Sequence, residues 1–122
     1  MENELKESPL ELLWTKEIKE GISKVAFAEG NIVVGTKDGW IKCFDLDGEL
    51  RWEHQRGIEV ISIAASSNNL IVSSKDNNIY LFNITGDLKW KRSHETYGDT
   101  CRISNKYILV GCSLFDMNGN LK

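Results

Sequence analysis

Tryptophan recurs along this chain at a fixed interval. Trp14, Trp52 and Trp90 each lie 38 residues from the next. Self-similarity with a period of about 20–50 residues is the signature of a repeat architecture. We therefore expect a row of similar units. The same interval relates further pairs: Asn31 and Asn69, Val34 and Val72, Lys37-Asp38 and Lys75-Asp76, Ile41 and Ile79, Phe44 and Phe82, Gly48 and Gly86, and Leu50 and Leu88.

One segment shows the repeat most clearly. FDLDGELRW at 44–52 returns as FNITGDLKW at 82–90 and as FDMNGNLK at 115–122. Its first copy crowds acidic side chains around Gly48, as a calcium-binding loop would. The second copy has Asn83 and Thr85 in place of Asp45 and Asp47, but it keeps the glycine and the tryptophan. The repeat preserves the turn and not the charge, so we predict a turn between two strands and no metal site.

Each full unit contains four short segments of strand character. In the first unit, Ser23–Ala28 alternates in hydrophobicity, with Val25 and Phe27 on one face. Asn31–Thr36 is almost continuously apolar, which is typical of a strand buried on both faces. Trp40–Asp45 and Glu49–Glu53 each follow a turn that contains glycine. Four strands in roughly forty residues indicate the blade of a β-propeller. We predict an all-β fold of four-stranded antiparallel blades, with about three blades' worth in this chain.

The phase of the repeat sets the predicted domain boundaries. Residues 1–11 form an N-terminal extension, 12–19 a lone outer strand, and the repeat units span about 21–57, 59–95 and 97–122. The third unit stops before its expected tryptophan, and its second hairpin is reduced to Cys112-Ser113. Three blades do not close a ring of the usual four to eight. Either the chain is part of a longer propeller, or two copies form a six-bladed ring in which the strand of Trp14 completes the partner's third blade.

These motifs resemble a known repeat family. Val-Gly-Thr-Lys-Asp-Gly-x-Ile at 34–41, followed by Phe-Asp-x-Asp-Gly-x-Leu-x-Trp at 44–52, resembles the PQQ-like, or quinoprotein-dehydrogenase-type, β-propeller repeat. The Gly-His and Trp-Asp dipeptides of WD40 repeats are absent from this sequence. The resemblance implies that tryptophans dock between adjacent blades. The residues expected in this docking are Trp14, Trp52, Trp90, Gly48, Gly86 and Gly119.

Composition narrows the classes of partner. The net charge is −3, which argues against electrostatic binding to nucleic acid or to an anionic membrane. No apolar run approaches the roughly 20 residues that cross a bilayer, and the acidic N-terminus lacks the features of a secretory signal. We expect a cytoplasmic protein. Cys43, Cys101 and Cys112 then are buried small hydrophobes, with a Cys101–Cys112 disulfide as the alternative for an exported chain.

The function expected is a non-catalytic scaffold that binds a protein partner through loops on one face. Trp40 replaces the polar residue found in the next unit, so it is the leading candidate for a recognition aromatic. The other candidates lie in the turns between second and third strands and in the connections between blades. They are Lys37, Asp38, Lys75, Asp76, Arg56, His94, Glu95 and Tyr97.

Catalysis and cofactor binding have less support in the sequence. No recognisable nucleophile motif occurs, and His54 is expected to be solvated. The PQQ-like resemblance raises the question of a quinone cofactor. In the quinoprotein enzymes of this family, cofactor binding implies a full ring and often adjacent cysteines. This chain has no adjacent cysteines and about three blades, so we expect no cofactor. The rival hypothesis is a ligand-binding or enzymatic propeller that uses the central channel. Lys24, Ser62 and Arg102 would line that channel from the first strand of each blade.

Overall fold

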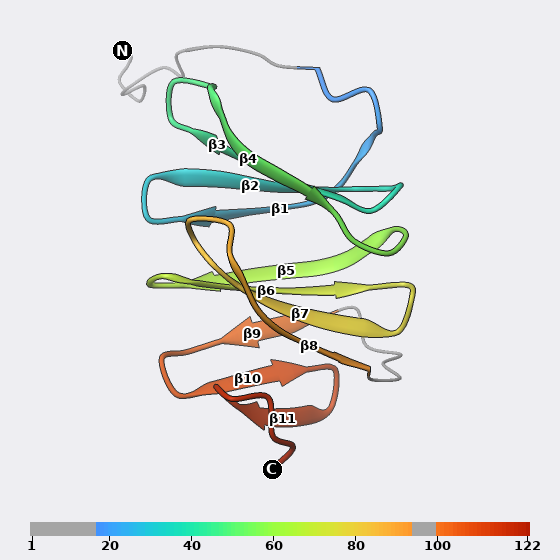
Figure 1. Ribbon diagram of the computed structural model, residues 1–122, viewed down its shortest axis with the longest axis vertical. Coiled ribbons are helices and arrows are strands. Elements are labelled where there is room, and N and C mark those ends of the chain that lie inside the picture. Colours follow the sequence, from blue (N-terminus) through green and yellow to red (C-terminus); the bar gives the residue numbers. More distant parts are fainter. Residues whose placement is uncertain (1–16, 94–99) are drawn as a thin grey trace, which may run out of the picture.

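The computed structural model describes residues 17–93 and 100–122. These residues form eleven β-strands in three antiparallel sheets, which follow one another along the long axis of the molecule (Figure 1). Each sheet is one blade, and its strands are hydrogen-bonded in sequence order. The all-β propeller class predicted from the repeat is therefore confirmed.

The strand bounds follow the repeat. The first blade contains β1 (Ile22–Ala28), β2 (Asn31–Thr36), β3 (Trp40–Asp45) and β4 (Leu50–Gln55). The second contains β5 (Val60–Ser66), β6 (Asn69–Ser74), β7 (Asn78–Asn83) and β8 (Leu88–Ser93). The third contains β9 (Cys101–Ile103), β10 (Tyr107–Val110) and β11 (Ser113–Asp116).

Agreement with the expected strands is close at the centre of a blade and looser at its sides. The segments predicted at Asn31–Thr36 and Trp40–Asp45 coincide with β2 and β3. The last strand, predicted at Glu49–Glu53, begins one residue later and continues to Gln55. Of the outer strand expected at 12–19, residues 17–19 form no strand, and the rest lies outside the described residues.

The hydrophobic core lies between the blades. In the first junction, Val33, Ile41 and Cys43 of the first blade pack against apolar side chains of the second, including Leu70 and Phe82. The second junction repeats this arrangement with Ile71, Ile79 and Leu81 on one side and Cys101, Ile108, Val110 and Phe115 on the other. The second blade is therefore covered on both faces, and its central strands β6 and β7 are buried at almost every position.

The turn between the last two strands of each blade is closed by one side-chain oxygen. Oδ1 of Asp45 accepts hydrogen bonds from the backbone amides of Asp47 (2.9 Å) and Glu49 (3.0 Å). Asn83 and Asp116 do the same in the second and third blades. Both Asp and Asn supply this acceptor, so the sequence varies between them while the turn persists. The residue at this repeat position therefore acts as the hydrogen-bond acceptor that closes the turn.

Loops gather at two opposite sides of the blade stack. The β2–β3 turn, the β4–β5 connection and the β6–β7 turn share the right side of Figure 1. The β1–β2, β3–β4, β5–β6 and β7–β8 turns share the left side. Among the described residues, no helix is long and apolar enough to cross a membrane.

Candidate binding edge

The repeated tryptophans lie at the junctions between blades. The indole of Trp52 stacks on Phe82 of the second blade, with ring centroids 6.0 Å apart. Its Nε1 donates a hydrogen bond to the carbonyl of Ile84 at 2.9 Å. Trp90 repeats this bond by donating to the carbonyl of Met117 in the third blade at 3.0 Å. A half-buried aromatic with a satisfied polar atom therefore joins the first blade to the second and the second to the third. Trp14 lies outside the described residues.

A second residue two positions further along reinforces each junction. Nε2 of His54 lies 2.7 Å from the carbonyl of Gly86, which only accepts, so this nitrogen carries the proton. Arg92 occupies the same repeat position in the second blade and donates to the carbonyls of Gly119 and Asn118. The expectation of a solvated His54 is therefore wrong, because the ring is stacked on Phe82 and hydrogen-bonded across the junction.

Glycine in the repeated turns permits these cross-blade contacts. A Cβ at Gly86 would lie 2.8 Å from the Trp52 ring, and one at Gly119 would lie 2.9 Å from Nε of Arg92. Gly48 occupies the same turn in the first blade, where its amide donates to the carbonyl of Asp45. The glycine lets a side chain of the preceding blade lie against the turn backbone.

Three loops of the first two blades form a continuous surface, which we call the connection edge. It comprises the β2–β3 turn (37–39), the β4–β5 connection (56–59) and the β6–β7 turn (75–77). The amide of Arg56 donates to the carbonyl of Gly39 at 2.9 Å, and the amide of Lys75 donates to the carbonyl of Glu59 at 2.9 Å. Backbone hydrogen bonds thus hold the three loops together on the rigid strands.

The connection edge brings together five of the nine predicted partner-binding residues, and a sixth, Trp40, borders it. Lys37, Asp38 and Lys75 are exposed. The Asp38 carboxylate accepts a hydrogen bond from the Thr36 hydroxyl at 2.7 Å, so this acid shapes its own turn. Lys75 forms an ion pair with Glu59 at 2.9 Å.

Two predicted residues differ from the rest in their surroundings. Trp40 borders the edge and is half-buried, with the Lys42 ammonium 5.4 Å from the centroid of its ring. It therefore presents only part of its ring to solvent. Arg56 is half-buried, and its Nε is buried without a hydrogen-bond partner. The predicted residues His94, Glu95 and Tyr97 lie outside the described residues.

A cleft of about 330 Å³ opens on this edge between the first two blades. It combines Arg56 and Asp76, which were predicted, with Tyr80 and Lys91, which were not. Tyr80 could have been found as Trp40 was, because its counterpart one repeat earlier is the unrelated Lys42. The full lining is Gln55, Arg56, Gly57, Asp76, Asn78, Tyr80, Leu88 and Lys91.

A carboxylate–phenol pair forms the floor of this cleft. The Tyr80 hydroxyl donates to Oδ2 of Asp76 at 2.8 Å, and the Asn78 amide donates to Oδ1 at 3.0 Å. Burial alone would raise the pKa of Asp76. The hydrogen bonds stabilise the charged form more strongly than burial disfavours it, so the net effect is a lowered pKa. Burial and the neighbouring carboxylate raise the pKa of Tyr80 to about 12. At neutral pH the pair is therefore a carboxylate bound to a protonated phenol.

Of the three residues expected along a central channel, Ser62 is arranged differently from the prediction. The first strands β1, β5 and β9 of neighbouring blades contact one another. Lys24 and Arg102 are exposed, but Ser62 is buried, and its hydroxyl oxygen accepts a hydrogen bond from the Cys101 amide at 3.0 Å. Ser62 thus joins two blades and does not line an open channel. Among the described residues no group of three potential metal ligands occurs.

The three cysteines are not linked to one another. Cys43 and Cys101 are buried in the two junction cores, and burial raises the pKa of both thiols. Cys112 is exposed and free. The alternative of a Cys101–Cys112 disulfide is therefore wrong for this structure, and so is the expectation that all three are buried.

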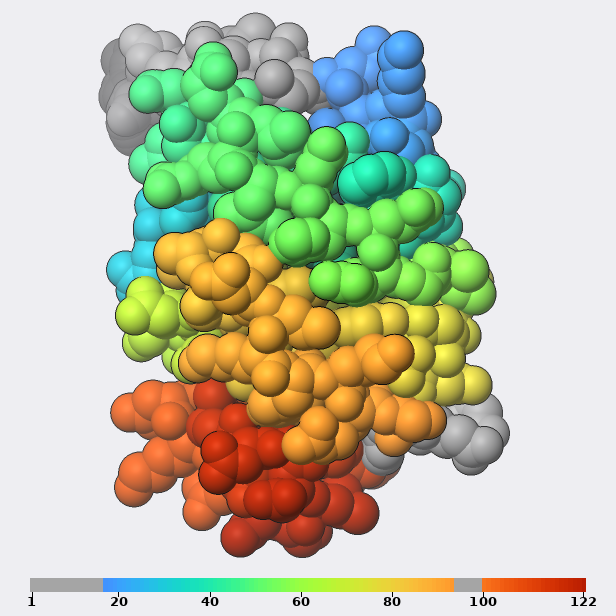
Figure 2. Space-filling model, in the orientation of Figure 1, coloured from blue at the N-terminus to red at the C-terminus, as the bar shows by residue number. Residues whose placement is uncertain are grey.

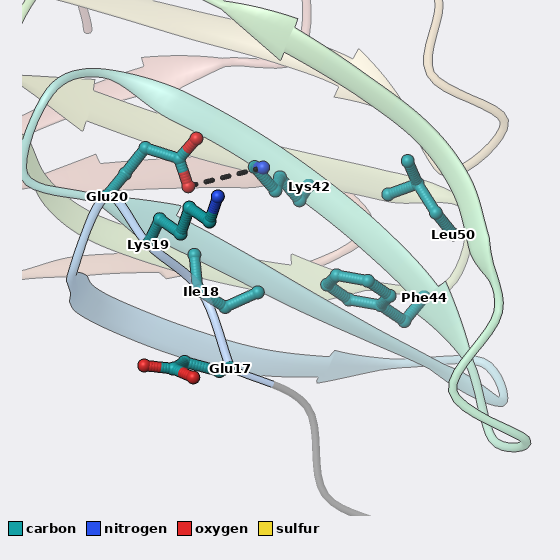
Figure 3. Close-up of a pocket in the computed structure, with 7 residues that line it drawn as sticks. All are labelled: Glu17, Ile18, Lys19, Glu20, Lys42, Phe44 and Leu50. Carbon is teal, nitrogen blue, oxygen red and sulfur yellow. Dashed lines mark ion pairs between the residues drawn. The ribbon is translucent and has the colours of Figure 1, made fainter.

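A second hollow, of about 310 Å³, lies on the outward face of the first blade (Figure 3). Ile18, Phe44 and Leu50 supply its apolar wall, and an ion pair between Lys42 and Glu20 at 3.3 Å borders it. Phe44 holds the repeat position of Phe82, the ring on which Trp52 stacks in the next blade.

Stacked antiparallel blades joined by docked tryptophans define a β-propeller repeat protein. The chain belongs to the PQQ-like family described as outer membrane protein assembly factor BamB, whose model matches residues 8–118. The PQQ-like resemblance of the sequence is thereby confirmed. No curated protein sequence matches the chain.

Solved structures share the fold. The crystal structure of the computationally designed Ika4 protein aligns with a TM-score of 0.77 at 23% identity, over 93% of this chain and 78% of that one. BamB from Moraxella catarrhalis aligns with a TM-score of 0.67 at 20% identity, over 80% of this chain and 34% of that one. This chain thus spans about a third of that BamB, and at these identities the likeness concerns the fold.

Proposed function

We propose that this chain is a non-catalytic propeller module that binds a protein partner through the connection edge. Membership of a family named for an assembly factor supports a scaffold role at the level of the family. The observation that carries the choice of surface is the cleft beside Arg56, where a cation and apolar side chains meet on loops fixed by backbone hydrogen bonds.

The charges of the edge favour an acidic partner segment. Its carboxylates are engaged within the edge: Asp38 with Thr36, Glu59 with Lys75, and Asp76 with Tyr80. Arg56 and Lys91 line the cleft, and exposed Ile58 adds an apolar contact beside it. A guanidinium binds a carboxylate with two parallel hydrogen bonds, which gives both strength and orientation. The preferred ligand is therefore a peptide that carries carboxylates next to apolar side chains.

We also propose that the protein is cytoplasmic and that its role is non-catalytic. A cytoplasmic location agrees with three cysteines that are not paired with one another. The non-catalytic role agrees with the hydrogen bond between Tyr80 and Asp76. Because these two side chains bind each other, we expect the cleft to bind a ligand without reacting with it.

The test is a capture experiment with matched variants. Immobilised wild-type chain is incubated with an extract of its source cells, and the captured partner is identified and then titrated by calorimetry. Arg56→Gln should weaken binding about tenfold or more, because it removes a desolvated charge from the contact. Trp40→Ala should weaken it less, since only part of the ring is exposed.

The control is Lys89→Gln, which removes a cation at the opposite side of the second blade. Lys89 donates to Oδ1 of Asn69 there and is not one of the residues that line the cleft. Binding should be unchanged in this variant. A partner that tolerates Arg56→Gln and is lost with Lys89→Gln would show that the connection edge is the wrong surface.

A further inference from the structure

The cleft on the connection edge carries three charged side chains. Arg56 and Lys91 contribute two positive charges to its lining, and the Asp76 carboxylate contributes one negative charge. The carboxylate stays ionised, because hydrogen bonds from the Tyr80 hydroxyl and the Asn78 amide help to lower its pKa. The phenol of Tyr80 stays neutral, because its pKa is raised to about 12. The lining therefore has one positive charge in excess.

The negative charge lies directly beside the loop that carries Arg56. A Cβ at Gly57, the next residue, would collide with Oδ2 of Asp76, so the carboxylate is pressed against this backbone. Among the described residues, neither Arg56 nor Lys91 forms an ion pair. An anion that binds to these two cations therefore lies close to a carboxylate that is fixed in place.

The corresponding hollow of the first blade has a different balance of charge. Three residues of the cleft are replaced one repeat earlier: Arg56 by Ile18, Tyr80 by Lys42 and Lys91 by Glu53. The Lys42 ammonium is 3.3 Å from the Glu20 carboxylate, a pair that Figure 3 shows, and 3.4 Å from that of Glu53. Its charge is thereby neutralised within the chain. The excess of positive charge is specific to the cleft between the first two blades and is not a property of the repeat.

The cleft opens where the outer strands of the two blades come together. Figure 2 shows β4 in green and β8 in orange on the same face of the molecule. The end of β4 contributes Gln55 to the lining, and β8 contributes Leu88 and Lys91. Leu88 is 39% exposed and offers an apolar wall in the same cleft as the cations. A side chain with methylene groups and one anionic end therefore matches this lining.

We infer that the cleft selects the single carboxylate of a glutamate or aspartate side chain and rejects a phosphorylated side chain. This inference rests on the proposed function and specifies the ligand group of the same cleft. A carboxylate balances the one excess positive charge. A phosphoserine carries about −1.5 to −2 charges at neutral pH, so it leaves unbalanced negative charge beside Asp76. Like charges held close together oppose binding. Asp76 is therefore the residue that determines the selectivity.

The test is an NMR titration of the isotope-labelled chain with three blocked tripeptides. Each peptide has leucine on both sides of a central glutamate, glutamine or phosphoserine. The glutamate peptide should shift the amide signals of cleft residues, including Arg56, Gly57 and Tyr80. It should bind about tenfold more tightly than the glutamine peptide, because only the glutamate side chain carries a charge. The phosphoserine peptide should bind about threefold or more weakly than the glutamate peptide.

Two variants of the floor of the cleft separate charge from shape. Asp76→Asn should reverse the order of glutamate and phosphoserine, because it removes the negative charge and keeps an oxygen that can accept from the Tyr80 hydroxyl. Tyr80→Phe keeps the carboxylate and should keep the preference for glutamate. Lys89→Gln is the control, because Lys89 is not one of the residues that line the cleft, and it should leave the order unchanged. Amide signals outside the cleft check that each variant is folded.

The inference and the proposed function fail in different ways. A phosphoserine peptide that binds the wild type as tightly as the glutamate peptide would overturn the inference. The proposed function would then stand, because both peptides are acidic. The absence of shifts in the cleft with all three peptides at about 10 mM would also overturn the inference, since even a millimolar affinity would be detected. A captured partner that is insensitive to Arg56→Gln would instead refute the proposed function.

Discussion

The Tyr80 hydroxyl should contribute stability that disappears as the pH rises above 10. Tyr80 is 3% exposed and donates to the Asp76 carboxylate at 2.8 Å. Ionisation of the phenol would remove this donor and place two negative charges side by side. The folded protein therefore holds the phenol in its protonated form, and its pKa is raised to about 12.

The sign and size of the effect follow from linkage. A group whose folded pKa exceeds its unfolded value of about 10 contributes stability that is complete below pH 10. The contribution is lost as the pH rises from 10 toward 12. A difference of about two pKa units corresponds to roughly 3 kcal/mol. A hydrogen bond to a charged group has a similar worth, about 1.5–3 kcal/mol. Tyr80→Phe should lose this amount at neutral pH.

The assay is urea unfolding followed by tryptophan fluorescence at intervals from pH 7 to 11.5. The difference in unfolding free energy between wild type and Tyr80→Phe should be about 2 kcal/mol at pH 7 and should shrink steadily above pH 10. Tyr107→Phe is the matched control, because Tyr107 is 46% exposed, and it should differ little from wild type throughout. A difference for Tyr80→Phe that stays constant up to pH 11.5 would refute the reasoning.

Two further predictions concern packing and thiol access. Gly86→Ala should cost about 2–4 kcal/mol by thermal or urea unfolding, because the new methyl group would lie 2.8 Å from the Trp52 ring at a φ of +100°. Gly30→Ala is the control and should cost only about 1–2 kcal/mol, since Gly30 also has a positive φ, +75°, but no atom lies within 4 Å of an added Cβ. Equal costs for the two variants would show that the contact with Trp52 is unimportant. Cys112 should react with a thiol reagent in the folded protein, while the two buried cysteines react only on unfolding. Reaction of all three thiols at the same rate without denaturant would contradict the burial of Cys43 and Cys101.

The strands of each blade were accessible to sequence reasoning because their signals are local. Continuous apolar character predicted Asn31–Thr36 as a strand buried on both faces, and the bounds of β2 agree. The Asp-Gly turns follow from backbone geometry and from one side-chain acceptor, which both Asp and Asn provide. The side strands agreed less well, because their ends depend on what the neighbouring blade covers.

Sequence reasoning predicted only part of the candidate site. Arg56 and Asp76 were predicted from their place in loops, but the partnership of Asp76 with Tyr80 was not, since a tyrosine on an inner strand gives no sign that it reaches the turn. His54 was misjudged for a similar reason. Its hydrogen-bond acceptor, the carbonyl of Gly86, lies in the next blade, as does the Gly119 acceptor of its repeat counterpart Arg92.

The sequence by itself determined the period, the four-stranded blade and the family, because each rests on residues close together within one repeat. Only the tertiary structure decided what each blade presents to the next. Trp52 and its acceptor Ile84 are 32 residues apart and belong to different blades. A repeat shows which residues are equivalent, but not which ones face each other across a junction. Which residues face each other depends on how whole sheets pack. The same packing buries both faces of the second blade and leaves the outward faces of the first and third blades exposed.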